Sequence, residues 1–218
     1  MKKIMKNSTN YYGNTRPEVM AFIPKDIKTI LDIGCGEGNF LKSVKDLTGA
    51  ETWGVELVAE VANNKKNDIN NLLIGKIEDV LSQIPDSYFD CITFNDVLEH
   101  LIDPTLILTN IKPKLKDNGL ILASIPNVRF IYNLFELIVK KDWEYKNQGI
   151  LDYTHFRFFT QKSMRRMFQN AGYVVIKQKG INKTSAFKLK LFNILTLGFF
   201  ADTLYQQFVC ISSKNTQI

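Results

Sequence analysis

Short apolar runs alternate along the chain with segments in which apolar residues recur every three or four positions. The runs predict strands over 29–33, 52–56, 71–75, 88–95, 119–125, 173–177 and 206–212. The helical periodicity predicts helices over 39–47, 59–66, 105–115, 130–140 and 161–171, and an apolar helical piece over 187–205. Because strands and helices alternate up to residue 125, the pattern predicts βαβ units around a parallel sheet.

The alternation breaks after Pro126, where residues 127–160 are irregular and rich in aromatic side chains. We interpret this stretch as an inserted lid over a substrate, within one domain spanning 1–218 whose core is about 11–126 and 161–212. The predicted fold class is α/β, a doubly wound, Rossmann-like sheet of seven strands, mostly parallel, with the last strand antiparallel. A chain of 218 residues is long enough to bury such a core.

Hydrophobic residues make up 45% of the chain and charged residues 23%, which is typical of a globular protein. The longest apolar stretch, 189–201, is interrupted by Lys190 and Asn193 and is shorter than the ~18–20 residues of a transmembrane helix. The basic start of the chain is not followed by the apolar run of a signal peptide. We therefore expect a cytoplasmic protein. Its three cysteines, which form no Cys-x-x-Cys pair, are expected to be buried thiols.

The net charge of +6 comes from lysines spread along the sequence rather than from one basic block. This spread favours a solvated surface over a nucleic-acid interface, so no nucleic-acid partner is expected. Attraction of an anionic partner is the alternative: a nucleotide-linked substrate or an acidic membrane surface. The apolar piece at 187–201 is expected to pack on the core, with peripheral membrane contact as its alternative. The oligomeric state is open.

A glycine-rich loop follows the first predicted strand, with glycines at Gly34, Gly36 and Gly38 and with Asp32 just before it. Glycines there let the backbone turn tightly and approach a ligand. Glu56, 22 residues after Gly34, ends the second predicted strand, where an acid can accept hydrogen bonds from ribose hydroxyls. The third glycine comes one position earlier than in the dinucleotide fingerprint, which argues against a nicotinamide-dependent oxidoreductase.

Residues 30–38, read with an acid at Glu56, resemble motifs I and II of class I S-adenosylmethionine-dependent methyltransferases. The chain is most similar to the branch of ubiquinone-biosynthesis O-methyltransferases and related enzymes of cell-surface polysaccharide clusters. The resemblance covers about 11–178 and is strong again in 95–104. It implies S-adenosylmethionine as cofactor, S-adenosylhomocysteine as product and a small molecule as methyl acceptor.

Carried over by position, the resemblance implies a cofactor site made of Tyr12, Arg16, Asp32, Gly34, Gly36, Gly38, Glu56, Leu57, Ile77, Glu78, Asn95 and Asp96. The glycine backbone would approach the methionine part, and Asp32 would orient the loop. Glu56 would hold the ribose, with Leu57 against the adenine. Arg16 would pair with the carboxylate of the cofactor.

The only two histidines, His100 and His155, are the candidate catalytic residues. Methyl transfer to a hydroxyl benefits from a base that takes the proton, and histidine is suited to this near neutral pH. His155 is the preferred base, whereas a structural hydrogen bond is the favoured role for His100. Nothing in the sequence resembles a zinc site, so no metal is assigned, and the use of a divalent metal of the catechol-methylating type stays open.

The segment that starts at Asn95 lacks the Asn/Asp-Pro-Pro-Tyr/Phe stretch of amino methyltransferases that act on nucleic-acid bases. The remaining acceptors are hydroxyls of small molecules. The resemblance of residues 152–160 to the enzymes of polysaccharide clusters implies a sugar or surface-glycan precursor, with a quinone precursor as the alternative. Two readings from other classes also stay open: a nicotinamide-dependent oxidoreductase and a non-catalytic S-adenosylmethionine-binding module.

Overall fold

The computed structural model describes residues 15–63, 69–185 and 193–214. The chain divides into two compact units. The first unit comprises Met1–Asn95, Asn110–Ile121 and Lys214–Ile218, and the second comprises Asp96–Thr109 and Leu122–Ser213. The predicted single domain stays a prediction.

One sheet of seven strands has the order β3-β2-β1-β4-β5-β7-β6. The strands are β1 Thr29–Ile33, β2 Glu51–Glu56, β3 Asn71–Ile74, β4 Phe89–Asn95, β5 Leu115–Pro126, β6 Val174–Lys183 and β7 Tyr205–Ser213. The pairs β1–β2, β1–β4 and β2–β3 are parallel, whereas β6 and β7 are antiparallel. The predicted fold class is therefore confirmed.

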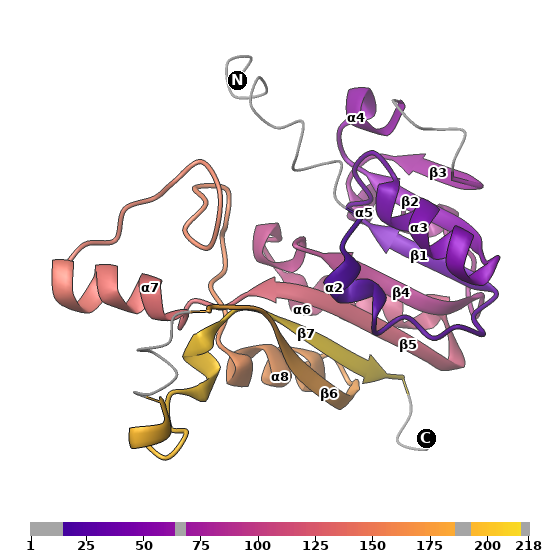
Figure 1. Cartoon of the computed structure of the whole chain (residues 1–218). Helices are drawn as coiled ribbons and strands as arrows, with labels where there is room; N and C mark the ends of the chain where they lie inside the picture. Colours follow the sequence, from indigo (N-terminus) through magenta and orange to yellow (C-terminus); the bar gives the residue numbers. More distant parts are fainter. Residues whose placement is uncertain (1–14, 64–68, 186–192, 215–218) are drawn as a thin grey trace. The chain divides into compact units, whose positions relative to one another are not determined.

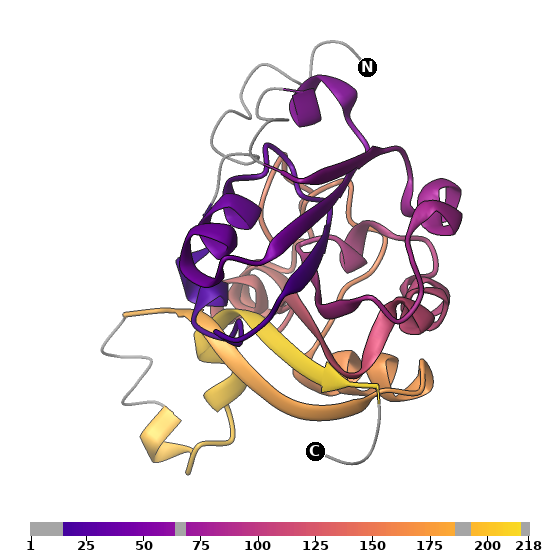
Figure 2. The same ribbon diagram turned by 90° about the vertical axis from the view of Figure 1, so that its right-hand side faces the viewer.

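The first unit is built around β1, in which all five residues are buried between its two parallel neighbours. Its helices are α2 Pro17–Met20, α3 Asn39–Thr48, α4 Ala59–Asn63 and α5 Ile77–Val80, with a 3-10 turn at Leu81–Gln83. The strand order reverses direction at β1, and right-handed crossovers then place α3 and α5 on opposite faces of the sheet (Figure 2). The carboxyl ends of β1, β2 and β4 therefore meet at one edge of this unit, where ligands bind in such folds.

The second unit contains the β6–β7 hairpin and α8 Gln161–Asn170 (Figure 1). Thr160 starts α8 with a capping box, because its side chain accepts from Ser163 N and the Ser163 hydroxyl accepts from the backbone N–H of Thr160. Most of α6 Pro104–Ile111, the short helix α7 Ile131–Phe135 and 3-10 turns at Leu98–His100 and Ala201–Leu204 complete this unit. A 3-10 turn at Lys112–Lys114 follows α6.

Several predicted boundaries are wrong. The helix predicted over 105–115 ends at Ile111, since Pro113 has no N–H to continue it, and β5 begins at Leu115 rather than at 119. Strand β6 continues to Lys183 because its edge pairs with the whole of β7. The predicted helix over 130–140 changes at Glu136 into a π-helical turn, Glu136–Lys140. In the described part of 187–205, Leu197 and Gly198 have positive φ angles of 50° and 80°, which no continuous helix accommodates. Strand β7 then begins at Tyr205.

Candidate functional site

The loop between β1 and α3 contains three glycines with positive φ angles, 75° at Gly34, 56° at Gly36 and 81° at Gly38. Residues with a side chain rarely adopt this conformation, which explains why glycine occupies these positions. The N–H groups of Gly34 and Cys35 donate to the carbonyl of Val55 at 2.8 and 3.1 Å, which ties the loop to β2. The backbone of the loop is thus held close to the end of that strand.

Glu56 is buried at the end of β2 and reaches back to this loop. One carboxylate oxygen accepts from the N–H of Gly36 at 2.8 Å, and the other accepts from the N–H of Val58 at 2.9 Å. Each carboxylate oxygen can accept more than one hydrogen bond. Glu56 can therefore hold the loop and still accept hydrogen bonds from ligand hydroxyls.

Asp32 is buried at the end of β1, where its Oδ1 accepts from the hydroxyl of Thr93 at 2.6 Å and from the amide of Asn95 at 3.2 Å. Burial raises the pKa of Asp32 to about 7, although these hydrogen bonds and the positive charge of Arg16 oppose the rise. A cation placed beside Asp32 would favour its ionised form. The carboxyl group is therefore suited to receive an ammonium group.

Asn95 supplies an acceptor without a partner at the same strand ends. Its Oδ1 is buried and has no hydrogen-bond partner among the residues that the structure describes. A buried acceptor left without a partner costs free energy, and an N–H donor of a ligand would remove that cost. Together, Asp32 and the Asn95 side chain could receive an ammonium group.

The other predicted cofactor residues of this unit differ in their exposure to solvent. The Leu57 side chain is exposed just after β2, and Glu78 is exposed in α5. The Ile77 side chain is buried in the core of this unit, and Arg16 occupies the N-cap position of α2 without a capping hydrogen bond from its side chain. Tyr12 lies outside the described residues. The predicted roles of these residues stay predictions.

Asp96 belongs to the second unit and adopts a positive φ of 56°. Its Oδ1 accepts from the Ser124 hydroxyl at 3.2 Å and from the Gln207 amide at 2.8 Å. Strands β5 and β7 thus hold this carboxylate in place. Neither partner is predictable from the sequence, because Ser124 lies 28 and Gln207 lies 111 residues from Asp96.

The two histidines pack together in the second unit, with ring centroids 4.6 Å apart and an interplanar angle of 73°. His155 Nδ1 lies 2.9 Å from the carbonyl oxygen of Ile150, and His100 Nδ1 lies 3.2 Å from that of Thr154. A carbonyl can only accept, so each Nδ1 carries the proton and each Nε2 carries the lone pair. Burial and the neighbouring His155 lower the pKa of His100. Each ring therefore has its lone pair on Nε2.

Backbone hydrogen bonds bring the segment around His155 to the segment around His100. The N–H groups of Phe156 and Arg157 donate to the carbonyl of Glu99, and the Arg157 guanidinium donates to the carbonyl of Ile102 at 2.6 and 3.1 Å. The histidines are far apart in the sequence, and these contacts bring their two segments together.

The same cluster includes the buried carboxylate of Glu99. One possible ligand atom from each of Glu99, His100 and His155 lies within 4.8 Å of the others. Two imidazoles and a carboxylate are a donor set that divalent transition metals accept. These three residues could therefore hold a cation.

The three cysteines are free and buried, as expected. None of the described helices has the length and apolar character needed to cross a bilayer.

Curated relatives are similar in sequence to part of this chain. It is 37% identical over 109 residues to the ubiquinone biosynthesis O-methyltransferase of Glaesserella parasuis serovar 5, covering 46% of each chain. It is 27% identical over 164 residues to the enzyme of the same name from Neisseria meningitidis serogroup A, covering 71% of this chain and 67% of that one. The chain thus spans about half to two thirds of the length of these relatives.

Solved structures share the fold across nearly the whole chain. A SAM-dependent methyltransferase from Archaeoglobus fulgidus superposes with a TM-score of 0.68 at 20% identity, covering 95% of this chain and 97% of that one. One from Aquifex aeolicus superposes with a TM-score of 0.62 at 16% identity, covering 98% and 96%. The family described as a methyltransferase domain matches residues 9–178, which include the glycine loop, Glu56 and both histidines. The chain therefore belongs to this methyltransferase-domain family.

Proposed function

We propose that the chain uses S-adenosylmethionine to transfer a methyl group to a hydroxyl group of a small molecule. The observation that carries this proposal is the hydrogen bond of buried Glu56 to the N–H of Gly36, in a chain of the methyltransferase-domain family. The names of the relatives support O-methylation, and those of the solved structures support S-adenosylmethionine as the cofactor.

Residues of the first unit would bind the cofactor. S-adenosylmethionine supplies a methyl group on a sulfonium, whose leaving group is a neutral thioether. Glu56 would accept hydrogen bonds from the ribose hydroxyls. Asp32 and the Oδ1 of Asn95 would receive the ammonium group, while Arg16 would pair with the carboxylate.

Residues of the second unit would handle the acceptor proton. As the acceptor oxygen forms its bond to the methyl carbon, the bond from that carbon to sulfur breaks, and the proton of the hydroxyl passes to a base. The Nε2 of His155 would take this proton, since its Nδ1 is held by the carbonyl of Ile150 in the tautomer that a base requires. His100 would fix the orientation of the His155 ring by edge-to-face packing.

The acceptor class is the finer part of the proposal. We propose a hydroxyl of a sugar or surface-glycan precursor, on the basis of the sequence resemblance of residues 152–160 to enzymes of cell-surface polysaccharide clusters. The second candidate is the hydroxyl of a quinone precursor, which is favoured by the similarity to ubiquinone biosynthesis O-methyltransferases. Both acceptors need the same proton transfer, so the histidine pair does not distinguish them.

Calorimetry tests the cofactor directly. We expect S-adenosylmethionine and S-adenosylhomocysteine to bind and NADH not to bind, and binding of NADH alone would refute the proposal. Methyl transfer from labelled cofactor is then measured on panels of sugar and catechol acceptors, with and without a chelator. Loss of turnover under chelation would assign the histidines to metal ligation instead of proton transfer.

A further inference from the structure

Two segments of the second unit expose large apolar side chains. The α7 arm, residues 131–140, exposes Tyr132, Phe135, Leu137, Ile138 and Val139. The C-terminal arm, residues 193–200, exposes Ile194, Leu195, Leu197 and Phe199. Leu197 and Phe199 keep 97% and 78% of their surface open to solvent. Soluble proteins rarely expose so many large apolar side chains in short segments unless another surface covers them.

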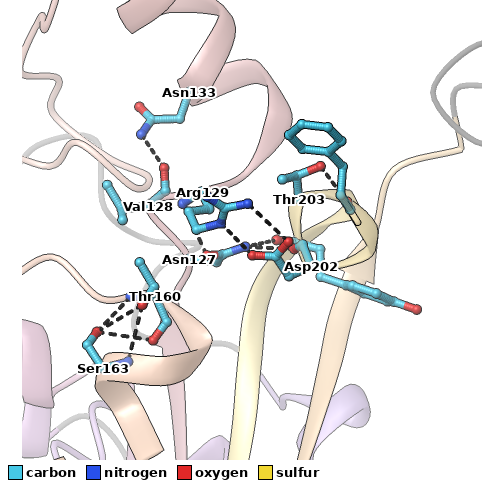
Figure 3. Close-up of polar contacts among 10 residues, drawn as sticks. Asn127, Val128, Arg129, Asn133, Thr160, Ser163, Asp202 and Thr203 are labelled. Atoms are coloured by element: carbon cyan, nitrogen blue, oxygen red, sulfur yellow. Dashed lines mark hydrogen bonds and ion pairs between the residues drawn. The ribbon is translucent and has the colours of Figure 1, made fainter. Parts of the chain in front are cut away.

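Both arms start from one polar anchor in the second unit (Figure 3). The Arg129 guanidinium, just before α7, pairs with the Asp202 carboxylate at 2.6 and 3.4 Å. The Asn127 amide donates to the carbonyls of Asp202 and Tyr205 at 2.9 and 3.0 Å, directly after the C-terminal arm. The bases of the two arms are therefore held together, while their apolar side chains point to solvent.

The backbone of the C-terminal arm is hydrogen-bonded within itself. The N–H groups of Leu197, Gly198 and Phe199 donate to the carbonyls of Ile194, Asn193 and Thr196 at 3.0, 2.8 and 3.0 Å. These bonds matter because an unsatisfied backbone group is costly in an apolar medium. The arm also holds Leu197 at a φ of 50°, a strained conformation for a leucine. Within the part of the chain that the structure describes, this conformation leaves the Leu197 side chain almost fully exposed.

Charge distinguishes the two units and points to the kind of surface that the arms meet. The second unit contains 13 Lys and Arg against eight Asp and Glu, a net charge of +5. The first unit contains 15 Lys and Arg against 14 Asp and Glu. The second unit therefore carries nearly all of the net charge of +6 of the chain. Lys140 and Lys141 directly follow the apolar residues of the α7 arm. Apolar side chains bordered by lysines suit an interface with anionic lipid.

We propose that the two arms dock the second unit on a bilayer surface that contains anionic lipid. The apolar tips would enter the boundary between headgroups and acyl chains, and the flanking lysines would meet the phosphates. Two separate arms suit a deformable lipid surface, into which each tip inserts on its own. This inference is independent of the identity of the methyl acceptor.

Co-sedimentation with vesicles tests the proposal on the full chain. One set of vesicles is phosphatidylcholine, and the other is phosphatidylcholine mixed with phosphatidylglycerol. We expect binding to the mixed vesicles that weakens with salt. Two variants, Ile138→Glu with Val139→Glu and Leu195→Glu with Leu197→Glu, should each lower the partition ~10-fold or more. Leu47→Glu is the matched control, because Leu47 is an exposed leucine of the first unit.

Several outcomes would overturn the proposal. These are no vesicle binding by the unchanged chain, equal binding to both kinds of vesicle, and an equal loss in the Leu47 control. A dimer that dissociates on the arm substitutions, seen by light scattering without vesicle binding, would assign the arms to a second copy of the chain. Thermal unfolding of each variant shows whether a loss of binding comes from the arm or from a misfolded protein.

Discussion

One carboxylate oxygen of Glu56 accepts a hydrogen bond from the backbone N–H of Gly36 at 2.8 Å, across the 20 residues that separate them. The bond links the end of β2 to the loop after β1 and has a direct consequence for cofactor binding. The carboxylate that is proposed to hold the ribose also holds the loop that is proposed to approach the methionine part. A substitution at Glu56 should therefore disturb both.

Glu56→Ala should weaken binding of S-adenosylmethionine by about 1–3 kcal/mol, since it removes charged hydrogen bonds to the ribose and the tie to Gly36. Calorimetry measures the change. Glu51→Ala is the matched control, because Glu51 begins the same strand and bonds to Trp53, Asn71 and Tyr88. Unchanged affinity in Glu56→Ala would show that Glu56 does not bind the ribose.

The raised pKa of Asp32 predicts that cofactor binding depends on pH. The folded chain holds Asp32 protonated up to about pH 7, whereas an ordinary aspartate ionises near 3.8. The ammonium of the cofactor favours the ionised form, so binding releases a proton below pH 7. Affinity should then rise with pH toward pH 7 by up to about tenfold per unit. Calorimetry in buffers of different ionisation enthalpy counts the protons released.

Asp32→Asn is the control for this pH dependence, because it removes the titrating group.

The stability of the fold should change with pH in the opposite direction to the affinity for the cofactor. The unfolded chain loses the Asp32 proton near 3.8 while the folded chain keeps it up to about 7, so the unchanged chain loses stability as pH rises between these values. Asp32→Asn should flatten that loss, which amounts to about 2–4 kcal/mol. A pH-independent affinity in the unchanged chain would contradict the assignment.

His155→Ala should lower turnover ~10²-fold or more and leave cofactor affinity unchanged, if Nε2 of His155 takes the acceptor proton. His100→Ala should lower turnover less, because its proposed role is to orient the neighbouring ring. Phe156→Ala, which changes an exposed neighbour, is the control. Initial rates with saturating cofactor measure all three. Full activity in His155→Ala would remove His155 from the catalytic residues.

Local sequence patterns are enough to predict the glycine loop of the first unit and the acid, Glu56, that lies beside it. The glycine loop and the acid after β2 lie at short, fixed distances from strands whose apolar runs are unmistakable. The partners of Asp32 are different, because Thr93 and Asn95 reach it only through the pairing of β1 with β4. A polar residue inside a buried strand is a weak signal that its side chain has a partner.

The histidine pair shows the same limit more clearly. Both histidines are visible in the sequence as candidates, but their pairing depends on the carbonyls of Ile150 and Thr154 and on the backbone contact of Phe156 with Glu99. Contacts between backbone groups do not depend on the type of residue, so they cannot be recognised in the sequence. The expectation that the apolar piece at 187–201 packs on the core is wrong for its described part. Apolar composition predicts burial, but the described side chains of 194–199 are mostly exposed.

Gly54→Ala should destabilise the fold by about 1–3 kcal/mol through overpacking beneath the glycine loop. Gly54 lies opposite Asp32 in the β1–β2 register, and a Cβ there would meet Sγ of buried Cys35 at 2.6 Å and the Leu41 side chain at 3.3 Å. Chemical denaturation measures the loss. Cys35→Ala removes the sulfur, so the double variant should recover part of the stability, and a double-mutant cycle gives the coupling. Strictly additive effects would show that Cys35 is not what excludes a side chain from position 54. Since the N–H of Cys35 is bonded to the carbonyl of Val55, the same overpacking should also weaken cofactor binding, which the double variant should partly restore.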